Sequence, residues 1–87
     1  MKKSEGVYFI YVLKSLKDCN LYIGCTSNLD KRLQYHDSGN VRSTKNRRPL
    51  ILIYKECYNN KYIAYKTERH YKTAVGKREL KNKISNE

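Results

Sequence analysis

Apolar residues gather in three short runs that predict β-strands. Residues 7–13 are almost entirely β-branched or aromatic, which is typical of a buried central strand. Residues 21–26 form a second apolar run, and the short polar segment between the two runs predicts an antiparallel hairpin. We expect Gly24 to end this second strand, at a close backbone approach or an unusual dihedral angle. Residues 50–58, which follow Pro49, predict a third strand that is buried throughout.

Helical spacing begins directly after the second strand. Residues 28–39 place Leu29, Leu33 and His36 on one stripe, and Gly39 supplies a stop signal. Three consecutive residues are candidate N-caps of this helix: Thr26, Ser27 and Asn28.

A second helix is predicted over residues 59–75, with Asn59 or Asn60 as its cap. We expect Gly76 to break it, and residues 77–84 to form a short third helix. The order β-β-α-β-α-α then predicts an α+β fold, a small three-stranded mixed sheet with flanking helices.

Length and charge narrow the class of protein. With 87 residues the chain is expected to form one domain over residues 1–87, with its core at about 7–84. It has no apolar run of the roughly 18 residues that a membrane helix needs. Its first residues lack the pattern of a secretory signal, so the cytoplasm is the expected compartment. A net charge of +11 predicts binding to a polyanion, most often nucleic acid.

The three cysteines, Cys19, Cys25 and Cys57, match no zinc-binding spacing. Buried or half-buried free thiols in a reducing compartment explain them. A nucleophilic Cys25 is the alternative, and it would need His36 or His70 as its base.

Candidate chemistry gathers around residues 21–36. Arg32 and His36 are four residues apart and share one helix face, while hairpin pairing can bring Tyr11 beside Tyr22. Arginine can hold a phosphate in a bidentate manner, and tyrosine or histidine can relay a proton, as phosphodiester cleavage requires. A hard divalent cation would also need an oxygen ligand. Glu68 could supply it, or could simply pair with Lys72 at i,i+4.

A basic loop precedes the third strand. Its cations could clamp phosphates beyond the scissile one, or could simply be solvated. They are Arg42, Lys45, Arg47 and Arg48.

The run "FIYVL" followed by "LYIG", with the motif tyrosines eleven residues apart, resembles the paired motifs of the GIY-YIG nuclease superfamily. Arg32 lies ten residues after Tyr22, His36 follows four residues later, and Glu68 lies in the second predicted helix. The likeness covers roughly residues 7–84 and is greatest to the small stand-alone bacterial branch, related to the N-terminal domain of the excision-repair nuclease. Two departures are the missing glycine of the first motif, Phe9-Ile10-Tyr11, and Cys25 where the repair nucleases carry lysine.

This resemblance implies a DNA endonuclease, of a kind connected with DNA repair, that uses one divalent cation, Mg²⁺ or another such as Mn²⁺. It implies that Glu68 holds the metal, that Tyr22 acts as general base and that Arg32 binds the scissile phosphate. Tyr11 would orient the water or the phosphate, and His36 would assist proton transfer. Asn82 is a candidate for the late asparagine that many members have in the site.

Two other functions stay open at this point. The chain could be a non-catalytic nucleic-acid-binding module of the same fold, which its charge and small size favour. It could also be a cysteine-based or purely structural protein. A bare nuclease core of this size would take its specificity from the structure of the DNA or from a protein partner.

Overall fold

The strands form one sheet in the order β2-β1-β3. The computed structural model describes residues 6–86, in which β1 spans Tyr8–Ser15, β2 spans Leu21–Thr26 and β3 spans Leu50–Tyr58. The expectation of a buried central strand is confirmed, because β1 lies between the other two and is their only partner. Both pairings are antiparallel, so the sheet is not mixed. The strands β2 and β3 do run in the same direction, but β1 separates them and they never pair.

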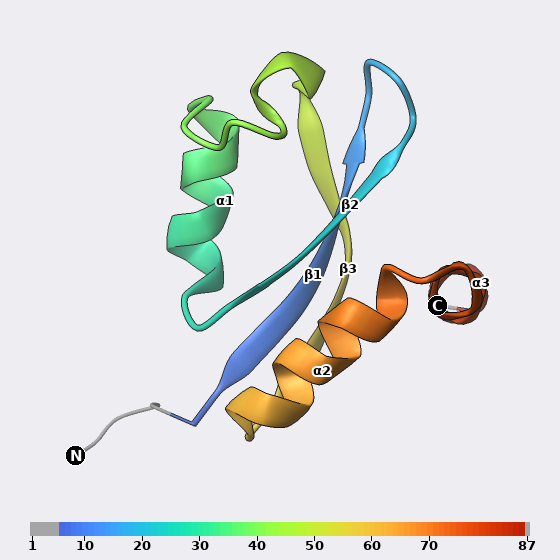
Figure 1. Ribbon diagram of the computed structural model, residues 1–87. Coiled ribbons are helices and arrows are strands. Elements are labelled where there is room, and N and C mark those ends of the chain that lie inside the picture. Colours follow the sequence, from blue (N-terminus) through green and yellow to red (C-terminus); the bar gives the residue numbers. More distant parts are fainter. Residues whose placement is uncertain (1–5, 87) are drawn as a thin grey trace.

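Helices cover both faces of this sheet. Helix α1 (Leu29–Asp37) packs on one face, and α2 (Lys61–Tyr71) and α3 (Ala74–Ser85) lie on the other side (Figure 1). A 3₁₀ turn (Lys45–Arg47) lies between α1 and β3. The side chains of Asn28 and Asn60 cap α1 and α2 by accepting hydrogen bonds from backbone N–H groups, which satisfies donors that have no partner within the helix.

The central strand supplies both hydrophobic cores, because alternate side chains of a strand point to opposite faces. Ile10 and Val12 pack with Tyr71 and Leu80, toward α2 and α3. On the other face, a second cluster packs beneath α1, and it consists of Tyr11, Leu13 and Leu29 with partly buried neighbours. Tyr11 is therefore a fully buried residue of the α1 face, where the candidate chemistry also lies.

The break between the last two helices is not at Gly76, as expected, but at Lys72 and Thr73. Helix α2 ends at Tyr71, and Thr73 caps α3 by accepting a hydrogen bond from the N–H of Gly76. Gly76 lies in the first turn of α3, where a Cβ atom would collide with the backbone carbonyl of His70. The glycine thus permits close approach of two helix ends rather than stopping a helix.

Two expectations about the strands are wrong. Strand β3 is an edge strand rather than a buried one, and its Ile51 and Leu52 are exposed. Strand β2 continues past Gly24 to Thr26.

The cysteines are free, but Cys19 and Cys57 are exposed and only Cys25 is half-buried. Within residues 6–86, none of the helices has the length and apolarity to cross a membrane.

Candidate active site

Tyr11 and Tyr22 meet on the α1 face of the sheet. In the β1–β2 pairing Tyr11 lies opposite Gly24 and Leu13 lies opposite Tyr22, so the two tyrosines are diagonal neighbours. Their ring centroids are 6.3 Å apart. The close approach expected at Gly24 is confirmed, because a Cβ atom there would overlap the phenol ring of Tyr11. Gly24 therefore leaves the space in which the Tyr11 ring lies across β2.

His36 of α1 is enclosed between these tyrosines and the basic loop. Its Nε2 lies 3.0 Å from the hydroxyl of Tyr11, and its Nδ1 lies 2.8 Å from the hydroxyl of Thr44. The Tyr22 ring packs edge-on against the imidazole, with centroids 5.1 Å apart. Both ring nitrogens are thus occupied by protein groups, and the side chain is 1% exposed.

The protonation of His36 follows from its surroundings. Burial, and secondarily the charge of Arg32, lower the pKa of the imidazole, so the ring is neutral at neutral pH. In the neutral ring one nitrogen donates and the other accepts, and the two nitrogens are bonded to Tyr11 and Thr44. This chain of hydrogen bonds fixes the Tyr11 hydroxyl relative to α1.

Thr44 is a site residue that the sequence analysis missed. It is fully buried although it lies in a loop of basic and polar residues. A single threonine in such a loop carries no periodicity that would indicate burial.

The charges of Arg32 and Glu68 both influence the Tyr11 phenol. Burial raises the pKa of the Tyr11 phenol, Tyr22 raises it further, and Arg32 and Glu68 act on it with opposite signs. Tyr11 therefore keeps its proton. Arg32 comes from α1 and is half-buried.

The charges of Glu68 and Arg32 also affect the pKa of the Cys25 thiol. Burial raises the pKa of its thiol, Glu68 raises it further, and Arg32 opposes the shift only in part. Of the two candidate bases, His36 has both ring nitrogens engaged and His70 has its Nε2 bonded to Glu79. This arrangement favours a protonated, unreactive thiol.

Glu68 reaches the site from α2, and its side chain is 16% exposed. Its Oε2 lies 3.1 Å from Nζ of Lys72, so the i,i+4 ion pair considered above is present. Within the described residues, no three histidine, cysteine or carboxylate side chains gather as a metal cage. A single carboxylate suits Mg²⁺, which keeps several waters and binds phosphate oxygens, and it does not suit a zinc site of four protein ligands.

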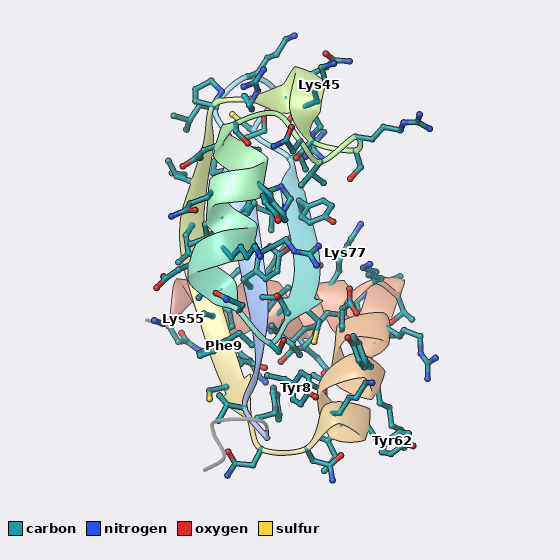
Figure 2. All side chains as sticks on the ribbon, turned by 90° about the vertical axis from the view of Figure 1, so that its left-hand side faces the viewer. Tyr8, Phe9, Lys45, Lys55, Tyr62 and Lys77 are labelled. Atoms are coloured by element: carbon teal, nitrogen blue, oxygen red, sulfur yellow. The ribbon has the colours of Figure 1, made fainter. Side chains whose placement is uncertain are left out.

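Figure 2 looks onto this face, with α1 in front, Lys45 of the basic loop at one end and Tyr62 of α2 toward the other. Two of the loop cations are held within the protein. Arg47 Nε lies 3.1 Å from a carboxylate oxygen of Asp18. Arg48 donates to the carbonyls of Lys45 and Asp37 at 3.0 and 3.1 Å. Arg42, Lys45 and Arg48 are all exposed, and among these three only the guanidinium of Arg48 is engaged by such contacts within the described residues.

Asn82 is not brought to the site. It lies on α3, two residues after Leu80, which is fully buried against the sheet. Two residues correspond to about 200° around a helix, so Asn82 faces solvent on the side of α3 away from the sheet. Tyr11 and His36 lie on the other face of the sheet, beneath α1.

Comparison with known proteins agrees with the motif spacing. Residues 7–83 match the family model described as GIY-YIG catalytic domain. A UPF0213 protein from Staphylococcus haemolyticus is 36% identical over 75 residues, which cover 85% of this chain and 90% of that protein. A UPF0213 protein from Bacillus pumilus is 42% identical over 72 residues, 82% of this chain and 72% of that one. The solution NMR structure of a UPF0213 protein from Bacillus halodurans superposes with a TM-score of 0.55 at 28% identity, and covers 87% of this chain and 83% of that chain.

Proposed function

The chain belongs to the GIY-YIG catalytic domain family, and from that premise we propose that it is a divalent-metal-dependent DNA endonuclease. One observation carries the proposal. Tyr22 from β2 lies beside the buried Tyr11, and the charges of Arg32 from α1 and Glu68 from α2 both act on the Tyr11 phenol. A proton acceptor, a cation and a carboxylate at one place are what the hydrolysis of a phosphodiester needs.

Each of the three half-buried groups then has a role in this proposal. Arg32 binds the scissile phosphate through its planar guanidinium and offsets the charge that grows on the phosphate oxygens. Tyr22 acts as the general base that accepts the proton of the attacking water. Glu68 is the ligand for the cation, Mg²⁺ or Mn²⁺, which when bound supplies positive charge to the phosphate and the water. The net charge of +11 favours the approach of DNA to the protein.

Tyr11 and His36 act as positioning residues in this proposal. Both are 1% exposed or less, so neither is open to substrate. Their hydrogen bond fixes two rings against which the Tyr22 ring packs. The orientation of the Tyr22 phenol is therefore set by the packing of these two buried rings.

A specific observation favours the second candidate function, a non-catalytic nucleic-acid-binding module. Lys72 already neutralises the Glu68 carboxylate in this structure. In the endonuclease, Lys72 must give up this carboxylate to the metal ion. In the binding module, the ion pair would persist on DNA.

A plasmid-nicking assay separates the two. We expect the wild-type protein to convert supercoiled plasmid to the nicked form in Mg²⁺, and EDTA to stop the reaction. Glu68→Ala should abolish nicking while retaining DNA binding. Glu79→Ala is the matched control, because Glu79 is an exposed carboxylate that pairs with His70 on the outside of the helices. Wild-type protein that binds DNA without cutting it in either metal would identify the binding module.

A further inference from the structure

The outer side of α2 combines exposed aromatic rings with a row of cations. We call this surface the α2 ridge, and it consists of Lys61, Tyr62, Tyr65, Lys66 and Arg69. The ring of Tyr62 is the most exposed large apolar side chain among the described residues, at 85%. Glu68 is the only acidic residue of α2, and it turns toward the candidate active site. The ridge is therefore positively charged along its whole length.

Tyr62 is the ring of this ridge that remains free to stack. Tyr65 packs against Tyr8 with centroids 6.3 Å apart, and Nζ of Lys61 lies 5.9 Å from the centre of its ring. Tyr62 has no such aromatic or cation contact among the described residues, and Figure 2 shows it projecting from the end of α2.

The distance along α2 links Tyr62 to the site. Tyr62 and Glu68 are six residues apart, which is about 9 Å along a helix axis. In an extended single strand successive phosphates lie farther apart than the rise of about 3.4 Å in a duplex strand, so two or three nucleotides cover this distance. A DNA strand whose phosphate lies at Arg32 and Glu68 can thus reach the level of Tyr62 along α2.

From this arrangement we infer that the α2 ridge binds unpaired nucleotides next to the cleavage position, so that the substrate is DNA with a single-stranded segment. In a duplex each base face is covered by its neighbours, whereas an unpaired base offers its face to an aromatic ring. The cations Lys61, Lys66 and Arg69 would follow the backbone of the same strand. The charge of the ridge favours a polyanion over an apolar protein surface as its partner. The position of the ridge relative to the cut rests on the proposed function, but its preference for unpaired bases does not.

Binding measurements without metal test the inference apart from catalysis. Fluorescence anisotropy in EDTA would compare a labelled single-stranded oligonucleotide with its duplex, using wild-type protein, Tyr62→Ala and Tyr62→Phe. We expect Tyr62→Ala to weaken single-strand binding at least about fivefold, the lower end for loss of one base–aromatic stack, and to change duplex binding less than twofold. Tyr62→Phe keeps the ring and should bind as the wild type does. Because Tyr62 is so exposed, all three proteins should have the same Tm.

An abasic oligonucleotide provides the complementary control, since it keeps the phosphates and lacks the bases. Wild-type protein should bind it about as weakly as Tyr62→Ala binds the normal strand. Equal single-strand affinity of wild type and Tyr62→Ala would overturn the inference. An equal loss on single strand and duplex would also overturn it, and would indicate a general contact surface. A protein that shows the Tyr62-dependent preference but never nicks DNA would contradict the proposed endonuclease and leave this inference standing.

Discussion

The hydroxyl of Tyr11 and Nε2 of His36 share a hydrogen bond of 3.0 Å, and this bond joins the central strand to α1 inside the core. Burial lowers the pKa of the imidazole and keeps it neutral, so one of its nitrogens donates and the other accepts. The other ring nitrogen is bonded to Thr44, so the basic loop belongs to the same buried chain. Fold stability thus depends on the protonation state of His36. So does the position of the Tyr11 and His36 rings against which Tyr22 packs.

Acid should destabilise the protein through His36. The folded state lowers the pKa of His36 below the ordinary 6.5, so below about pH 6.5 the unfolded chain binds the proton more readily. The contribution to stability is complete above that pH and is lost as the pH falls toward the lowered pKa. Urea unfolding should show a free energy that falls by up to about 1.4 kcal/mol per pH unit in this window.

The matched comparison is between His36→Gln and His70→Gln. His36→Gln should be less stable at pH 7.5 and should lack most of the dependence between pH 6.5 and 5.5. His70 pairs with Glu79 on the surface, so His70→Gln should follow the wild-type profile. Identical profiles for wild type and His36→Gln would show that the imidazole is not held neutral.

Gly24→Ala should destabilise the fold. The added methyl group overlaps the Tyr11 ring, and overpacking of this kind costs about 1–3 kcal/mol. The cost should be smaller in a Tyr11→Leu background, where no ring crosses the glycine. Urea unfolding of the two single variants and the double variant measures this coupling. Additive losses would mean that the glycine serves some purpose other than making room for Tyr11.

The sequence predicted contacts that local pattern and register determine. Element order, the caps Asn28 and Asn60, and the meeting of Tyr11 with Tyr22 follow from helical spacing and hairpin pairing. The position of β3 at the sheet edge does not, because an apolar run such as residues 50–58 does not say how many neighbours the strand will have.

Long-range contacts explain the other differences. Thr44 is buried by a histidine on another element, and Gly76 matters because the end of α2 lies against it. The position of Asn82 after Glu68 suggests a place near the site, whereas the early start of α3 at Ala74 fixes which of its sides meets the sheet. The roles of Tyr11, Tyr22, Arg32, His36 and Glu68 stay predictions that require kinetics.

The basic loop should contribute to DNA binding through only half of its cations. Replacing Arg42 and Lys45 by glutamine should reduce the slope of log affinity against log salt by about one for each phosphate that is no longer neutralised. Replacing Arg47 and Arg48 should instead lower the Tm. Arg47 forms an ion pair with Asp18, and Arg48 donates a hydrogen bond to the carbonyl of Asp37 at the end of α1. Anisotropy titrations across a salt series and thermal unfolding distinguish the two pairs. A salt slope unchanged in the Arg42 and Lys45 variant would mean that the loop is only solvated.

Tyr22→Phe should separate chemistry from folding. The substitution removes one hydroxyl and keeps the ring that packs against Tyr11 and His36, so the Tm and DNA affinity should be unchanged. The nicking rate should fall at least about a hundredfold, the lower end for loss of a general base. Tyr35→Phe is the matched control, because Tyr35 is an exposed tyrosine of α1, and it should nick at the wild-type rate.

Arg32→Lys tests the other half of the same site. Lysine keeps the charge but lacks the planar fork that fits two phosphate oxygens, so the nicking rate should also fall by about a hundredfold, on the order of one missing transition-state donor. His36→Ala, measured at a temperature where it stays folded, should cost less because His36 acts only through Tyr11 and Tyr22. Single-turnover nicking rates at saturating protein compare the three changes without interference from affinity. If Tyr22→Phe cuts as fast as the wild type while Arg32→Lys does not, the phosphate site is correct and the base must be a group other than Tyr22.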